Sequence, residues 1–187
     1  MAPDNLLAQL RLAAAAGGAG RTDEALRVVR KVARAPGSPG PRDPRLFARL
    51  AAASLMARLL AEPPKEVDAR RLAESMSRDL AELQLFQGPG TLVILSWQDL
   101  AADLILTTRA GGKGEAMAGE ATDAAAIGLS SLLLPAGKRP SIQVHLRSAP
   151  AAKPLPLSVI TIEHDGRGFK ASVKRVELAA GQTDLGL

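Results

Sequence analysis

The sequence predicts an α+β protein in which an N-terminal antiparallel bundle of about four helices is followed by a C-terminal antiparallel β-sandwich. Apolar residues recur at spacings of three and four before residue 88, and they gather in short runs of strand length after it. The segment Gln87-Gly88-Pro89-Gly90 lies between the two patterns and is rich in turn-forming residues. We therefore expect a helical bundle over residues 1–87 and a β-sandwich over residues 88–187.

Local signals mark the helices of the first half. Thr22 or Asp23 can cap the second helix, and Asp43-Pro44 restarts the chain with proline at the first helical position. The prolines and glycines between residues 36 and 44 interrupt the helical pattern, as does Pro63-Pro64. Short connections favour antiparallel neighbours. The expected helices cover about residues 5–16, 22–34, 43–61 and 65–85.

The second of these helices carries the clearest candidate binding surface. Four basic residues follow one another at i, i+3, i+4 and i+7, which places them on one helical face: Arg27, Arg30, Lys31 and Arg34. This face is either a docking surface for an acidic partner or a solvated outer face. The segment Gly20–Val32, together with the Leu/Ala-rich helix before it, resembles one degenerate tetratricopeptide repeat. That resemblance implies either the end of a longer repeat array or a small helical bundle.

Six or more strands are expected in the second half, with candidates at about residues 91–97, 102–107, 126–134, 141–147, 155–163 and 169–178. The run Thr91–Trp97 is apolar throughout, which is typical of a strand covered on both faces. Asp165-Gly166-Arg167-Gly168 predicts a hairpin turn, and a slip in the apolar alternation predicts a bulge within Lys174–Leu178. We expect Arg109–Thr122, rich in Gly, Ala and charged residues, to form a long mobile surface loop.

The strand half also resembles a known family. Leu92–Trp97, Asp103-Leu104 and the hairpin around Asp165-Gly166 are similar to the uncharacterised β-sandwich domain at the C-terminal end of large bacterial proteins. In those proteins the domain commonly follows tetratricopeptide repeats, or a vault-protein-inter-alpha-trypsin domain paired with a von Willebrand factor A domain. Gln98 stands where that family usually has an aspartate. The resemblance implies an accessory, non-catalytic module.

Nothing in the sequence predicts an enzyme. A catalytic triad needs a histidine, and the two histidines, His145 and His164, are expected at a strand surface and beside a turn. Asp99 and Asp103 follow Trp97 and could chelate calcium, but the acidic spacing of a calcium loop is absent, and a turn hydrogen bond from Asp99 is the alternative. Trp97 is expected in the core, with its indole N–H bonded locally. We therefore predict no catalytic residue, no cofactor and no metal site.

Composition narrows the choice of partners and compartment. The formal net charge is +5, yet aromatic residues are only 2%, so the stacking platforms of single-strand binders are lacking and nucleic acid is disfavoured. No signal peptide and no membrane span are visible, which favours the cytoplasm, or the cell envelope if the sequence is a fragment. There are no cysteines. Exposed strand edges or Leu185-Gly186-Leu187 could mediate oligomerisation.

These observations predict a non-catalytic protein–protein interaction or structural module, the terminal part of a larger bacterial protein or assembly. The alternative is a β-sandwich that binds glycan or calcium through the loops after Trp97 and around Arg109–Asp123. A protein partner is expected under the first hypothesis.

Overall fold

The computed structural model describes residues 8–9, 12–13, 15–16, 19, 21–33, 44–62, 68–99, 101–109, 120–124, 128–137, 141–147 and 152–187. The chain forms two compact units, Met1–Leu85 and Phe86–Leu187. Each unit is described by itself below.

The first unit is helical. Its helices are α2 (Thr22–Ala33), α3 (Pro44–Ala61) and α4 (Ala69–Glu82), and helical turns are also present at residues 8–9, 12–13 and 15–16. The start of α3 at Pro44 confirms the predicted proline at the first helical position. At α4, the Asp68 side chain accepts hydrogen bonds from the backbone N–H groups of Arg70 and Arg71, so it caps a helix that the sequence pattern placed a few residues too early.

The prediction of a four-helix bundle of the tetratricopeptide type is wrong. The described residues contain three helices, whereas eight strands in two antiparallel sheets make the fold mostly β. α3 contacts both α2 and α4, and it buries residues on several sides, including Phe47, Ala53 and Met56. A period of 3.6 residues reveals which face of a helix is apolar, but it does not reveal how many helices share that face.

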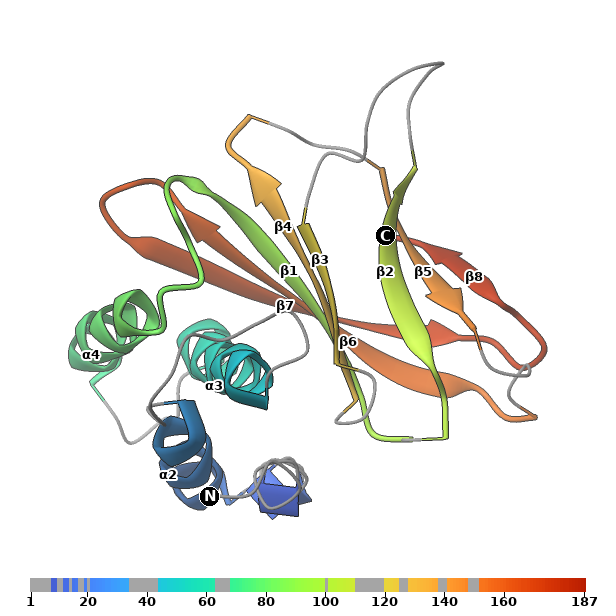
Figure 1. Ribbon diagram of the computed structural model, residues 1–187, viewed down its shortest axis with the longest axis horizontal. Coiled ribbons are helices and arrows are strands. Elements are labelled where there is room, and N and C mark those ends of the chain that lie inside the picture. Colours follow the sequence, from blue (N-terminus) through green and yellow to red (C-terminus); the bar gives the residue numbers. More distant parts are fainter. Residues whose placement is uncertain are drawn as a thin grey trace. The chain divides into compact units, whose positions relative to one another are not determined.

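The second unit contains two antiparallel sheets (Figure 1). The five-stranded sheet has the order β3-β4-β1-β6-β7, and the three-stranded sheet has the order β2-β5-β8. The strands are β1 (Gly90–Trp97), β2 (Leu104–Arg109), β3 (Glu120–Ala124), β4 (Leu129–Pro135), β5 (Ser141–Leu146), β6 (Leu155–His164), β7 (Phe169–Leu178) and β8 (Asp184–Gly186). This arrangement is loosely compatible with the predicted β-sandwich.

Strand β1 lies in the middle of the larger sheet, between β4 and β6. Its residues Leu92–Leu95 are all buried, which confirms the prediction of a strand covered on both faces. Because alternate residues point to opposite faces, Val93 and Leu95 lie toward one side of the sheet and Leu92 and Ile94 toward the other.

The two sheets share one apolar core. Both sheets contribute buried side chains to it: Val93, Leu95, Trp97, Ala102, Leu104, Leu106, Leu132, Leu134, Val144, Leu146, Leu155, Leu157, Val159 and Leu178. One hydrogen bond also joins the sheets directly, since the Leu106 backbone N–H of β2 donates to the Ser130 Oγ of β4 over 3.0 Å. Ser130 is fully buried. Its hydroxyl therefore gives a partner to the backbone N–H of Leu106, which lies on the edge strand β2 and, among the described elements, has no strand on that side to pair with.

The hairpin between β6 and β7 is the turn that the sequence predicted. Gly166 has φ +90°, and Asp165 Oδ1 accepts hydrogen bonds from the backbone N–H groups of Arg167 and Gly168. These two N–H donors favour the ionised carboxylate, so they lower the pKa of Asp165.

The predicted bulge in β7 is wrong. The ladder with β6 continues without interruption from His164↔Phe169 to Leu155↔Leu178. Ala171 and Val173 lie opposite Ile162 and Ile160 on one face of the sheet, whereas Val176 and Leu178 lie on the face that packs into the shared core. The alternation slips because the apolar contacts of this strand change face along its length, while its register stays constant.

Two strands were not predicted from the sequence. β3 begins within the segment that we expected to be a loop, so the loop prediction is wrong for Glu120 to Thr122, and it is also wrong for Arg109, which ends β2. Residues 110–119 lie outside the described residues. β8 has three residues and pairs with β5. Strands this short carry too little alternation to be recognised without their partners.

Candidate functional site

The candidate site is the outward face of α2. Asp23 and Glu24 lie in the first turn of this helix, where acidic side chains are favourable, and Arg30 and Lys31 lie in the last turn. Leu26 and Val29 are buried, and α2 packs against α3. Burial of that stripe leaves the opposite side of the helix to solvent.

The structure divides the four basic residues predicted on this helix. The side chains of Arg27 and Lys31 are exposed, and neither has an ion-pair partner among the described residues. Arg30 is half-buried and forms an ion pair with Asp79 of α4. Arg34 lies outside the described residues. The charge available to a partner therefore comes from Arg27 and Lys31, while Arg30 links two helices of the unit.

A surface depression lies along this face. Its volume is about 440 Å³, and it is lined by Asp23, Leu26, Arg27, Arg30 and Lys31. Leu26 contributes an apolar side chain to the wall, and Asp23 contributes one negative charge at its N-terminal end. Asp23 and Leu26 were not predicted as site residues, although they precede Arg27 and Arg30, respectively, by four positions, a spacing at which helical side chains are neighbours.

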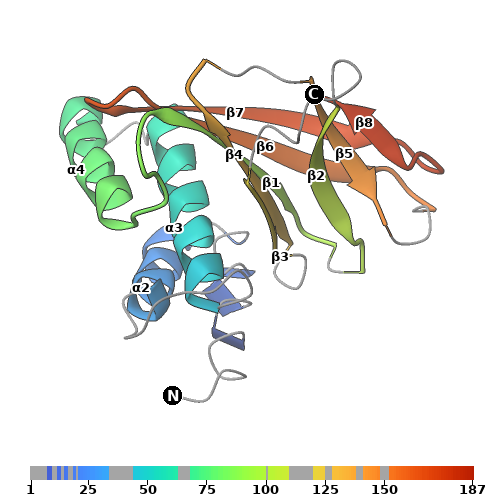
Figure 2. The same cartoon turned by 45° about the horizontal axis from the view of Figure 1, so that its top comes forward.

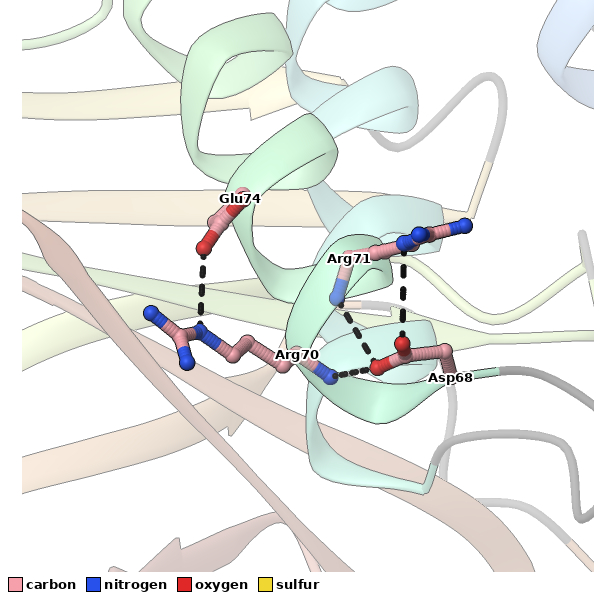
Figure 3. Close-up of polar contacts among 4 residues, drawn as sticks. All are labelled: Asp68, Arg70, Arg71 and Glu74. Atoms are coloured by element: carbon pink, nitrogen blue, oxygen red, sulfur yellow. Dashed lines mark hydrogen bonds and ion pairs between the residues drawn. The ribbon is translucent and has the colours of Figure 1, made fainter.

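The arginines of α4 offer a contrast within the same unit. Arg70 Nε lies 3.3 Å from Glu74 Oε1, and Arg71 Nε lies 3.7 Å from Asp68 Oδ2, as Figure 3 shows. These arginines are exposed like Arg27, but acids of their own helix already lie beside them. A positive charge that is balanced locally attracts an incoming anion less than one that is not.

The two acids that could chelate calcium according to the sequence, Asp99 and Asp103, each interact with another group of the chain. Asp99 Oδ1 accepts a hydrogen bond from the Ala101 backbone N–H over 3.0 Å, which confirms the predicted turn interaction. Asp103 Oδ1 lies 2.7 Å from Arg147 Nη2, in an ion pair across two connections of the sheet. No group of three or more His, Cys, Asp or Glu side chains that could hold a metal ion occurs in the part of the chain that the structure describes.

Trp97 is a core residue, as predicted. Its indole Nε1–H donates to the Ala102 backbone carbonyl over 3.0 Å, and the side chain belongs to the core between the sheets. It therefore offers no exposed aromatic platform for a sugar.

The two histidines lie in different sheets. His145 is exposed on β5, the predicted solvent side, and its Nδ1 lies 2.8 Å from Asp184 Oδ1 of β8, directly opposite it in the ladder. His164 is half-buried at the end of β6, where it stacks on Phe169 with ring centroids 4.6 Å apart and contacts Phe86. Neither histidine's partners follow from the local sequence, because Asp184, Phe86 and Phe169 are brought beside the imidazoles only when the strands pair and the chain folds.

The hydrogen bond between His145 and Asp184 leads to a testable prediction about the pKa of the Asp184 carboxyl group. The hydrogen bond from His145, and after it that from the Thr183 hydroxyl, lowers the pKa of Asp184 below 3.8. Because the pKa of Asp184 is lower in the folded chain than in the unfolded chain, ionised Asp184 stabilises the fold at pH values above its unfolded-state pKa. This stabilisation is lost as the pH falls through its folded-state pKa. We expect His145→Ala to raise the Asp184 pKa toward 3.8, as measured by NMR titration of the carboxyl carbon. An unchanged pKa in this variant would contradict the assigned cause.

The comparisons with known proteins give no relative. No family model matches the chain, and no curated protein or solved structure matches it significantly. Among the described residues, no helix has the length and apolar character needed to cross a membrane.

Proposed function

We propose that the chain is a non-catalytic protein-interaction module in which the outward face of α2 receives an acidic segment of a partner protein. The observation that carries this proposal is the pair Arg27 and Lys31: both are exposed, one helical turn apart, and without an acidic partner among the described residues. They lie beside a depression of about 440 Å³ that Leu26 helps to line.

The chemistry of this face suits a peptide that carries both acidic and apolar side chains. Carboxylates of the partner would lie near Arg27 and Lys31, where attraction accelerates association and selects the correct orientation. An apolar side chain beside them would enter the depression and contact Leu26, as anchors do in protein interfaces. Arg30 would remain in its ion pair with Asp79, which joins α2 to α4 and holds this side chain beside the depression.

The test compares two matched double variants of the full chain. Arg27→Ala/Lys31→Ala and Arg70→Ala/Arg71→Ala each remove two exposed positive charges from a helix of the same unit. The probe is a fluorescein-labelled amphipathic helical peptide with glutamates and a single leucine on one face, and binding is followed by fluorescence anisotropy. We expect the α2 variant to weaken binding about tenfold, with a smaller dependence on salt, and the α4 variant to change it little.

Two outcomes would contradict the proposal. An equal loss in both variants would show that only net charge matters, and unchanged binding in the α2 variant would place the probe elsewhere. Circular dichroism of both variants checks that the helices are retained, which alanine favours.

A further inference from the structure

Strand β7 forms the longest edge of the two sheets. It is the last strand in the order β3-β4-β1-β6-β7, it covers Phe169–Leu178, and it can be followed along the border of the larger sheet in Figure 2. Ten residues of extended chain span about 33 Å. Among the described elements, only β6 pairs with it.

The other edge strands offer a shorter stretch of backbone for pairing, or have a backbone group that is already bonded. β8 has three residues and β3 has five, while the edge strand β2 already donates its Leu106 N–H to Ser130. In an antiparallel ladder, every second residue directs its backbone N–H and C=O away from its neighbour. β7 therefore presents, along its whole length, the groups with which an extended chain can pair.

The charges on β7 decide what kind of chain suits this edge. The strand carries Lys170, Lys174 and Arg175 against the single acid Glu177. Lys170 and Lys174 are exposed on the same face. Lys170 lies opposite Glu163 of β6, whereas Lys174 lies opposite the buried Val159 and has no acid across from it, so Lys174 is the less balanced charge of the two. A second copy of the chain would bring a second set of these cations to the same edge, which like-charge repulsion opposes. An acidic strand would instead place carboxylates beside the lysines.

We propose that β7 binds an extended acidic segment of a partner protein as an additional strand of the five-stranded sheet. Backbone hydrogen bonds to β7 would hold the segment, and alternate acidic side chains would meet Lys170 and Lys174 on one face. This site lies in the second unit and does not depend on the proposed role of α2.

The experiment uses the full chain and two peptides with identical side chains. The first is a labelled ten-residue peptide of alternating glutamate and valine, and the second has the same sequence with every backbone amide N-methylated. Both carry the same charge, but only the first can donate backbone hydrogen bonds. We expect the first to bind, the second to bind at least tenfold more weakly, and Lys170→Ala/Lys174→Ala to weaken the first about tenfold.

Two further measurements make the result specific. Binding of the first peptide should slow the hydrogen exchange of β7 amides, and Arg70→Ala/Arg71→Ala, which removes two exposed charges elsewhere in the chain, should leave its affinity unchanged. Equal binding of both peptides would overturn the proposal, because charge alone would then suffice. Self-association in sedimentation velocity that the peptide competes away would also overturn it, because the edge would then belong to a second copy.

Discussion

Replacement of Trp97 by alanine is expected to lower the free energy of unfolding by about 3–5 kcal/mol. The side chain is only 4% exposed and packs in the core that the two sheets share. Removal of the indole leaves a cavity between the sheets and deprives the Ala102 carbonyl of its donor. Both consequences act in the same direction, which makes this the largest single-residue effect that we predict.

Two control variants separate these contributions. Trp97→Phe retains much of the apolar volume but loses the indole N–H, so a loss of about 1–2 kcal/mol is expected. Gln98→Ala changes an exposed neighbour and should stay within about 0.5 kcal/mol of the wild type. Urea unfolding is best followed by far-ultraviolet circular dichroism, because Trp97 is the only tryptophan. A loss in Trp97→Ala no larger than that in Gln98→Ala would show that Trp97 is not a core residue.

Replacement of Gly90 by alanine is expected to cost about 1–3 kcal/mol of stability. A Cβ at this position would lie 2.7 Å from the backbone oxygen of Leu134 on β4. β1 cannot move away easily, because Gly90 is paired with Pro135 on one side and with His164 on the other. The strain must therefore be shared by the backbones of three strands.

Gly88 supplies the matched control, since it lies two residues earlier in the same turn. A Cβ there has no heavy atom within 4 Å, and Gly88 is not among the glycines with positive φ. Alanine at position 88 is therefore expected to leave the stability unchanged, or to raise it by up to about 1 kcal/mol because alanine lowers the conformational entropy of the unfolded chain. Thermal unfolding of the two variants under the same conditions measures the difference. Equal stability of both variants would be inconsistent with the close approach of β1 and β4.

Several elements could be predicted because their causes are local. The proline that starts α3, the apolar run that becomes β1 and the glycine-containing turn between β6 and β7 all act within a few residues. The same holds for Asp99, whose carboxylate bonds an amide two residues away. The basic residues of α2 were also visible as a stripe, because helical periodicity determines which of them share a face.

Other features depend on segments that are distant in the sequence. The pairs Arg30 with Asp79 and His145 with Asp184 join residues 49 and 39 positions apart, so spacing could not reveal them. The expected four-helix bundle and the bulge in β7 were both wrong for a related reason. Periodicity describes the faces of one element, whereas the number of helices around α3 and the change of buried face along β7 are set by the elements packed against them.

The sequence by itself determined the approximate positions of three helices and six strands, because capping, turn chemistry and apolar period act on neighbouring residues. Only the tertiary structure decided which glycine tolerates a side chain, which arginine of α2 is committed to an ion pair, and which strand ends its sheet with a long edge. The physical reason is that close packing, electrostatic pairing and strand order are relations between surfaces, and those surfaces meet only when the chain is folded.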